Sequence, residues 1–298
     1  MNPPIYRGRF APSPTGLLHF GSLVSAVASY ADARYHNGQW LLRIDDLDRV
    51  RNVDGMDAHF LRALDAFGMH WDGTPCRQTQ HDSLYRDALA TLRESGFTYV
   101  CRCSRKSIRD HAEYGLDGPV YPGTCRDLNL EDGPQRSIRS KTDDPEIVFN
   151  DRVFGTQRQN LRHDIGDFVI RRADGFVAYQ LAVVVDDHLS RITDVVRGAD
   201  LLLSTPRQIH LHRCLGFPVP AYLHVPLVVG WDGKKLSKRD AAHPVDEKSP
   251  LKGLLAAWAF LGQTLPQGSD QPVQVAEFWE WAVAHWSPDA MKLCQENA

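Results

Sequence analysis

Two short segments carry residue types that can handle a polyphosphate, and more than two hundred residues of the 298-residue chain separate them. The first, residues 9–22, contains His19, which can donate a hydrogen bond to a phosphate, and Gly21, which lets a nucleotide lie close to the backbone. The second, residues 230–239, bears three lysines and an arginine that can close on a polyphosphate and neutralise a leaving pyrophosphate. Taken alone, each segment is more simply explained as a surface turn than as part of a phosphate site. Together they predict an ATP site.

The elements expected around these segments place them at the edge of a sheet. Residues 5–10 read as a short buried strand, two prolines then exclude a helix, and a helix is expected from residue 21. His19 therefore lies where a strand is followed by a helix, which is where open parallel sheets bind nucleotides. The lysine-rich segment follows a further apolar stretch, residues 223–229.

Strand-like and helical stretches alternate along the chain, which favours an α/β fold with a Rossmann-like, doubly wound parallel sheet. The expected strands are 5–10, 40–44, 99–101, 177–185 and 223–229, and the expected helices are 21–35, 53–67, 84–95 and 206–215. Residues 101–166 interrupt the alternation as an insertion rich in Asp, Arg, Gly and Pro. Residues 251–262 and 275–286 are apolar at helical spacing, so a short helical C-terminal region is expected over 241–298.

The two segments resemble the signatures of the class I aminoacyl-tRNA synthetases in their glutamate-specific form. These are Pro-x-Pro-x-Gly-x-x-His-x-Gly at 12–21 and Lys-Leu-Ser-Lys at 235–238, and the resemblance extends over about 6–239. It is supported by further segments at 43–48, 176–188 and 196–200. The resemblance implies activation of L-glutamate by ATP, accompanied by Mg²⁺, with His19 and Lys238 as catalytic residues. The residues it implies for ATP binding are His19, Gly21, Ser22, Lys235, Ser237 and Lys238.

Glutamate has two carboxylates and one ammonium, so its pocket needs at least one arginine and one acid. Arg9 and Arg197 are the candidate arginines, Asp45 is the candidate acid, and Tyr179 and Ser13 can add hydroxyl groups. The resemblance implies a pocket formed by Arg9, Phe10, Ala11, Pro12, Ser13, Asp45, Tyr179 and Arg197. Asp45 stands where the family usually has glutamate, which predicts a longer or water-mediated ammonium contact.

Cysteines cluster at the start of the insertion. Cys101, Cys103 and Cys125 lie within a segment the size of a zinc knuckle. Ligand chemistry alone favours His111 as a fourth zinc ligand, because imidazole is a much commoner zinc ligand than phenolate. The family resemblance instead implies Tyr121, four residues before the last cysteine, and one structural Zn²⁺. Three reduced cysteines without a metal are the alternative.

Chain length separates the long and short members of the family. After Arg239, 59 residues remain (298 − 239), fewer than the about 100 that a separate anticodon-reading domain needs. We therefore expect a catalytic domain over 1–240, with its insertion at about 101–166 receiving the tRNA, and no anticodon-binding domain. The resemblance to the short paralogues implies that the accepting hydroxyl belongs to queuosine at the wobble position of tRNA(Asp).

Two alternatives to this function stay open. A truncated glutamyl-tRNA synthetase would charge a tRNA 3′ end, and a non-catalytic RNA-binding paralogue would charge nothing. The retained His19, Gly21, Lys235 and Lys238 argue against the second alternative, because such a module needs no ATP site.

The composition, 43% hydrophobic and 24% charged, is typical of a globular enzyme. The net charge of −3 gives RNA no overall attraction, so tRNA binding must depend on local basic stretches such as 102–109 and 136–141. No apolar run reaches membrane length and the N-terminus has no signal-peptide pattern. We therefore expect a cytoplasmic monomer that makes no contact with membranes.

Overall fold

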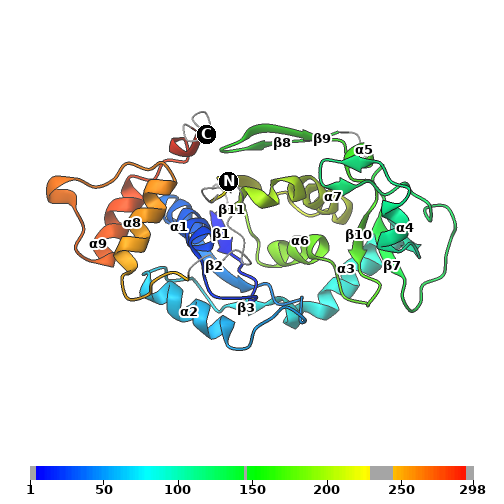
Figure 1. The fold of residues 1–298 in the computed structure, drawn as a ribbon, viewed down its shortest axis with the longest axis horizontal. Helices are drawn as coiled ribbons and strands as arrows, with labels where there is room; N and C mark the ends of the chain where they lie inside the picture. The colour runs from blue at the N-terminus through cyan, green and yellow to red at the C-terminus, as the bar shows by residue number, and fades with distance from the viewer. Residues whose placement is uncertain (1–4, 144–145, 229–243, 293–298) are drawn as a thin grey trace.

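The computed structural model describes residues 5–143, 146–228 and 244–292, and its central feature is a set of parallel strands (Figure 1). One sheet has the order β1-β2-β3 and contains β1 (Arg7–Phe10), β2 (Gln39–Ile44) and β3 (Cys76–Arg77). The other has the order β11-β12-β8-β9 and contains β11 (Asp194–Gly198), β12 (Ala221–Val225), β8 (Ile147–Asp151) and β9 (Gly155–Gln159). All these pairings are parallel except the β8–β9 hairpin.

The two parallel sheets meet along β1 and β11, which lie side by side (Figure 1). The backbone N–H of Thr193 donates to the Arg7 carbonyl at 3.0 Å, and the backbone N–H of Arg7 donates to Thr193 Oγ1 at 2.8 Å. The carboxyl ends of β1 and β11 therefore lie close together, which brings residues near positions 10 and 197 to one edge. The predicted α/β architecture with a parallel sheet is confirmed.

Helices cover both faces of these strands. On one face α1 (Phe20–Tyr35) is buried along most of its length and packs against α8 (Pro250–Phe260) and α9 (Val275–Ala284), with α2 (Met56–Ala66) beside them (Figure 1). On the other face α3 (Asp82–Glu94), α6 (Tyr179–Leu189) and α7 (Thr205–Leu215) share a second apolar core. The C-terminal segment is helical, as its apolar spacing predicted.

The cysteine-bearing region forms a separate end of the molecule (Figure 1). Its sheet is antiparallel with the order β10-β7-β4, formed by β10 (Phe168–Arg171), β7 (Ser137–Ser140) and β4 (Thr98–Cys101). The short elements around it are α4 (Arg105–Arg109), β5 (Tyr114–Gly115), β6 (Gly118–Pro119) and α5 (Leu161–Asp164). The described residues also form 3-10 helices at η1 (Gln78–His81), η2 (Ala199–Ser204) and η3 (Gly268–Asp270).

One predicted element is wrong. Residues 177–185 were expected to form a strand, but α6 begins at Tyr179 and continues to Leu189. The apolar run Leu181–Val185 is buried on every side. Such a run is equally compatible with a buried strand and a buried helix, and its three valines favoured the strand. The missing strand is β11, which follows α6 and carries Arg197.

One other strand and one hairpin lie in a different part of the fold from the one expected. The strand at 99–101 belongs to the antiparallel sheet with β7, not to the parallel strands. The hairpin β8–β9 lies within the segment expected as an insertion, yet β8 pairs with β12 of the main sheet. Among the residues that the structure describes, no helix has the length and apolar character needed to span a membrane.

Candidate active site

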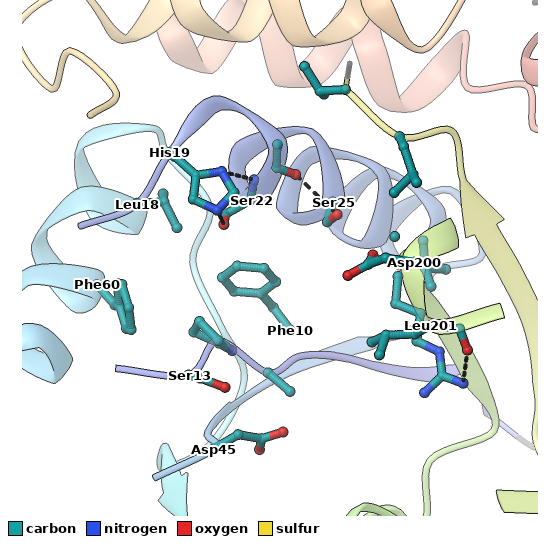
Figure 2. Close-up of a pocket in the computed structure, with 18 of the residues that line it drawn as sticks. Phe10, Ser13, Leu18, His19, Ser22, Ser25, Asp45, Phe60, Asp200 and Leu201 are labelled. Carbon is teal, nitrogen blue, oxygen red and sulfur yellow. Dashed lines mark hydrogen bonds between the residues drawn. The ribbon is translucent and has the colours of Figure 1, made fainter. Parts of the chain in front are cut away.

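A cavity of about 420 Å³ opens at the carboxyl ends of β1 and β11, beside the start of α1 (Figure 2). Every residue predicted to bind glutamate lines it: Arg9, Phe10, Ala11, Pro12, Ser13, Asp45, Tyr179 and Arg197. His19, Gly21 and Ser22 line it too. Lys235, Ser237 and Lys238 lie outside the described residues. The structure therefore brings the described members of both predicted sets into one cavity.

His19 caps the N-terminus of α1 at the wall of this cavity (Figure 2). Its Nδ1 accepts the backbone N–H of Ser22 at 3.2 Å, and its Nε2 lies 3.1 Å from Ser22 Oγ. Because Nδ1 accepts, Nε2 carries the proton in the neutral ring. A side-chain carbon at Gly21 would lie 3.4 Å from the His19 ring, so glycine keeps this end of the cavity open. The N-terminal end of a helix carries a partial positive charge, which favours an anion here.

Arg9 is already paired with a buried acid. Its Nε donates to Asp187 Oδ1 at 3.1 Å and its Nη2 to Oδ2 at 3.4 Å. Arg43 Nη1 donates to the same Asp187 Oδ1 at 2.5 Å. Burial raises the pKa of Asp187, but the two arginines outweigh it and bring the pKa down to about 2. Asp187 is therefore an ionised anchor for both guanidinium groups.

Asp45, the acid predicted for the substrate's ammonium, lies on the same buried network. Arg43 Nε donates to its Oδ1 at 2.6 Å. Burial raises the pKa of Asp45 to about 6, although Arg43 acts in the opposite direction. Asp45 is therefore ionised at neutral pH and faces the cavity while it is held by Arg43.

Arg197 is held differently, by neutral groups. Its Nε donates to His224 Nε2 at 3.1 Å and its Nη2 donates to Thr205 Oγ1 at 2.9 Å and to the Leu201 carbonyl at 3.4 Å. Its Nη1 is buried and has no hydrogen-bond partner among the residues that the structure describes. His224 in turn lies 2.6 Å from Asp151 through its Nδ1. Arg197 thus has one guanidinium nitrogen left for a ligand.

A second cavity, of about 880 Å³, adjoins the first. Ser13, Asp45 and Tyr179 line both cavities. The second cavity extends towards the cysteine-bearing region, and five arginines line it: Arg51, Arg102, Arg105, Arg139 and Arg172. The arginines of the second cavity could bind the phosphates of a ligand that lies beside the first cavity.

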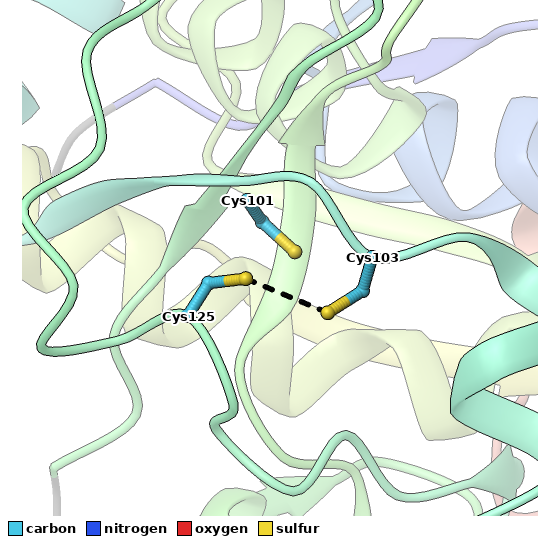
Figure 3. A group of neighbouring side chains, drawn as sticks. All are labelled: Cys101, Cys103 and Cys125. Atoms are coloured by element: carbon cyan, nitrogen blue, oxygen red, sulfur yellow. Dashed lines mark hydrogen bonds between the residues drawn. The ribbon is translucent and has the colours of Figure 1, made fainter.

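The three cysteines come together as predicted (Figure 3). The sulfur atoms of Cys101, Cys103 and Cys125 lie within 4.8 Å of one another. The Tyr121 hydroxyl is 3.4 Å from Cys101 Sγ and 3.6 Å from Cys103 Sγ. His111 is exposed instead, with its Nδ1 3.0 Å from the Ser107 carbonyl. Of the two candidates for a fourth ligand, Tyr121 is the one beside the thiols.

Arg139 contacts this cluster and also lines the second cavity. Its guanidinium lies 3.7 Å from the centre of the Tyr121 ring, and the residue lines the cavity. Burial raises the pKa of Cys101, but hydrogen bonds from Tyr121 and Arg139 outweigh it and lower the pKa to about 7. Burial and the neighbouring Cys125 thiol raise the pKa of Cys103 to about 11, so a soft metal ion would bind this cluster with loss of the thiol protons.

Sequence reasoning missed the residues that hold the two arginines. Asp187 belongs to an apolar run that ends in two aspartates, and buried carboxylates need a cationic partner, so this signal was available. His224 interrupts an apolar strand, which also marks a buried polar contact. Nothing in the sequence pairs His224 with Asp151, because 73 residues separate them.

Known proteins resemble this chain closely. Residues 6–254 match the family described as tRNA synthetases class I (E and Q), catalytic domain. Proteins named glutamyl-Q tRNA(Asp) synthetase match nearly the whole chain. The one from Dechloromonas aromatica is 51% identical over 98% of this chain and 97% of its own. The one from Chromobacterium violaceum is 50% identical over 96% and 95%.

A solved structure shows the same fold. The glutamate tRNA ligase of Elizabethkingia meningosepticum, in complex with its amino acid, is 26% identical with a TM-score of 0.78. The match covers 96% of this chain and 65% of that one, so this chain spans just under two thirds of the ligase. The family expected from the sequence is confirmed: the chain belongs to the class I tRNA synthetases for glutamate and glutamine, and among them to the glutamyl-Q tRNA(Asp) synthetases.

Proposed function

We propose that this protein activates L-glutamate with Mg²⁺-bound ATP and transfers the glutamyl group to queuosine at the wobble position of tRNA(Asp). The observation that carries the proposal is that the start of α1 and the side chains of Arg9, Asp45 and Arg197 line the same cavity. The relatives that match nearly the whole chain are named for this reaction. Because its proposed substrate is a tRNA, we propose that the protein acts in the cytoplasm, as a monomer.

In the first step a glutamate α-carboxylate oxygen attacks the α-phosphorus of ATP. A carboxyl oxygen–phosphorus bond forms, the bond to the bridging oxygen breaks, and pyrophosphate leaves with that oxygen. His19 Nε2–H and the Ser22 hydroxyl can donate to the phosphates at the positive end of α1. No proton moves in this step, so these residues act by positioning and by stabilising charge.

Lys235, Ser237 and Lys238 are assigned to the leaving pyrophosphate as part of the same proposal. They lie outside the described residues, but the residues flanking that stretch support the assignment. Val228 lines the cavity, and Pro244 forms an antiparallel bridge with His19. Both flanks thus lie at the ATP side of the cavity.

Glutamate is proposed to lie between Arg197 and Asp45. The α-carboxylate must stay free to attack ATP, so the γ-carboxylate is the group that Arg197 Nη1 would bind. Asp45 would accept the ammonium, with Arg9, Tyr179 and Ser13 around the substrate. Phe10, Ala11 and Pro12 complete the wall.

In the second step a queuosine hydroxyl attacks the carbonyl carbon of glutamyl-adenylate. The new ester bond forms, AMP leaves with the phosphate oxygen, and the hydroxyl proton is released. The second cavity supports this step because it adjoins the first and its arginines can neutralise RNA phosphates. Its wall includes Cys103, so the cysteine cluster borders the acceptor site.

We assign one structural Zn²⁺ to Cys101, Cys103, Cys125 and Tyr121. The residues fit the ion, because three close thiols and a hydroxyl provide the four ligands of a closed site. Zinc would fix the loop around residue 103 at the cavity wall. We assign the catalytic domain to 1–240, with its insertion at about 101–166, and the helical C-terminal segment to 241–298. The helices α8 and α9 of this segment pack on α1.

Pyrophosphate exchange tests the activation step. The wild-type protein is expected to exchange labelled pyrophosphate into ATP with glutamate and not with aspartate or glutamine. Lys238→Ala should nearly abolish this exchange without changing the thermal unfolding temperature, because charge on the leaving group is no longer neutralised. Unchanged exchange in Lys238→Ala would show that this lysine does not act in the reaction.

A further inference from the structure

A buried acid and histidine stand behind Arg197 on neighbouring strands. Arg197 of β11 and His224 of β12 are partners in the parallel ladder, and Asp151 of β8 pairs with Tyr222, two residues before His224. The side chains of His224 and Asp151 are fully buried. Neither belongs to the residues assigned to glutamate, ATP or zinc.

The hydrogen bonds fix the tautomer of His224. Asp151 Oδ1 accepts the backbone N–H groups of Val153 at 3.0 Å and Phe154 at 2.9 Å, and its Oδ2 lies 2.6 Å from His224 Nδ1. An acid that accepts this many N–H groups is ionised, so His224 Nδ1 carries a hydrogen and donates it. The Nε2 lone pair then faces Arg197 Nε–H at 3.1 Å. Burial lowers the pKa of His224, which agrees with a neutral ring.

Because the His224 ring is neutral, it does not offset the positive charge of Arg197. Arg9 forms a salt bridge with Asp187, whereas Arg197 has no salt bridge among the residues that the structure describes. Its acceptors are the imidazole, the Thr205 hydroxyl and a carbonyl. The guanidinium is therefore oriented without a carboxylate in direct contact, and its attraction remains available to an anionic ligand.

We propose that Asp151 and His224 are positioning residues for recognition of the substrate's γ-carboxylate. Asp151 holds His224 in the Nδ1–H tautomer, and His224 Nε2 orients Arg197 so that Nη1 meets the carboxylate. This inference rests on the proposed function, in which Arg197 binds glutamate. It adds a buried pair, distant from the substrate, that sets glutamate affinity.

The test compares three variants in glutamate-dependent pyrophosphate exchange. His224→Leu removes the acceptor for Arg197 Nε and should raise the KM for glutamate about 10- to 100-fold, the range of a hydrogen bond to a charged group. The KM for ATP should change less than about twofold, since ATP does not meet Arg197. His224→Gln, whose Oε1 can accept from Arg197, should recover most of the glutamate affinity. Asp151→Asn should give a glutamate KM between those of the two His224 variants, because an asparagine at 151 also permits the Nε2–H tautomer of His224.

His210→Leu is the matched control. His210 is also buried, with its Nε2 3.1 Å from Ser140 Oγ, and it does not line the cavity. Its loss should lower thermal stability and leave the KM for glutamate unchanged. If His224→Leu behaves like His210→Leu, the pair is structural and the inference is overturned. Should His224→Leu fail to fold, an unchanged glutamate KM in Asp151→Asn would overturn it equally.

The proposed function and the role of the Asp151–His224 pair can be refuted separately. Wild-type protein without glutamate-dependent exchange would refute the proposed function and, with it, the role of the pair. Normal wild-type exchange with a glutamate KM unaffected by Asp151→Asn and His224→Leu would refute the role of the pair alone.

Discussion

The cysteine cluster and the active-site cavity are built in opposite ways. The cluster comes from a single stretch, residues 101–125, and its three thiols and one hydroxyl lie in a small core of their own. The cavity draws on β1, α1, α2, α6 and β11, which extend over almost two hundred residues, and on Asp45 directly after β2. A local cluster can change without the sheet, whereas the cavity depends on the relative placement of distant strands.

Their buried charges differ as well. Beneath the cavity, Arg9 and Arg43 share Asp187, and Arg43 also holds Asp45. At the cluster, Arg139 is the buried charge in contact with Tyr121. Residues that share partners do not act independently, so substitutions in the cavity are expected to be non-additive. Substitutions in the cluster should affect the acceptor side alone.

Asp187→Asn should have the largest effect. It leaves two buried guanidinium groups with reduced compensation, which typically costs about 3–5 kcal/mol. The free energy of unfolding from denaturant titration measures this loss. Asp48→Asn removes an exposed pair with Arg51 and should change that free energy by less than about 1 kcal/mol. Equal effects of the two changes would contradict the buried network.

Arg197→Ala should come next. It removes the guanidinium assigned to the γ-carboxylate and should lower kcat/KM for glutamate in pyrophosphate exchange about 100-fold or more. Arg102→Ala, in the second cavity alone, should leave exchange unchanged and weaken transfer to tRNA. A normal glutamate kcat/KM in Arg197→Ala would separate Arg197 from the substrate.

Cys125→Ser should impair transfer to tRNA more than it impairs glutamate activation. Loss of a zinc ligand should remove the metal from the purified protein and reduce transfer to tRNA about 10-fold, the lower end for disturbed metal sites. Glutamate-dependent exchange should stay within about threefold, because the cluster lies outside the first cavity. Cys214→Ser, outside the cluster, should retain the metal.

The fourth ligand can be tested in the same metal assay. Tyr121→Phe should release zinc to a competing chelator more readily than the wild type, and His111→Ala should not, because His111 is turned away from the thiols. Faster release from His111→Ala than from Tyr121→Phe would reverse the assignment.

The smallest expected effect is a pH dependence. Asp45 has a raised pKa of about 6, so it becomes neutral below that pH and loses its attraction for the ammonium. The KM for glutamate should rise about 10-fold between pH 7 and pH 5, following the fraction of ionised Asp45. Asp45→Asn should show a high KM with little change over this range. A flat profile in the wild-type protein would contradict the role of Asp45.

Acid unfolding should not interfere with the measurement of the glutamate KM between pH 7 and pH 5. The raised pKa of Asp45 means that its protonation between about pH 6 and pH 4 favours the folded state. Asp187 behaves in the opposite sense: its pKa of about 2 lies below the free value of about 3.9. Its contribution to stability is complete above about pH 4 and is lost as the pH falls towards 2.

The sequence was informative where chemistry is local. The spacing around His19 and Gly21 predicted a strand-to-helix junction, and the structure has His19 as the cap of α1. The cysteines were predicted together and are together. In both cases the residues lie within a few positions or one short segment, so spacing alone constrains their geometry.

The sequence failed where burial erased the pattern or the partner was distant. The run before Asp187 lacks a polar face because α6 is buried on every side from Leu181 to Asp187, so it was mistaken for a strand. The partners of Arg9 and Arg197 lie on α6 and β12, and no local period encodes how these elements pack against β1 and β11. The family resemblance supplied Arg197 as a site residue, but the structure was needed to find His224 behind it.

The most direct test of the proposed function uses two forms of one tRNA. Labelled glutamate and ATP are supplied with tRNA(Asp) that carries queuosine and with tRNA(Asp) that has guanosine at the wobble position, each lacking the 3′-terminal adenosine. The account predicts glutamate on the queuosine form alone. Equal labelling of both forms, or no labelling until the 3′ adenosine is restored, would contradict it.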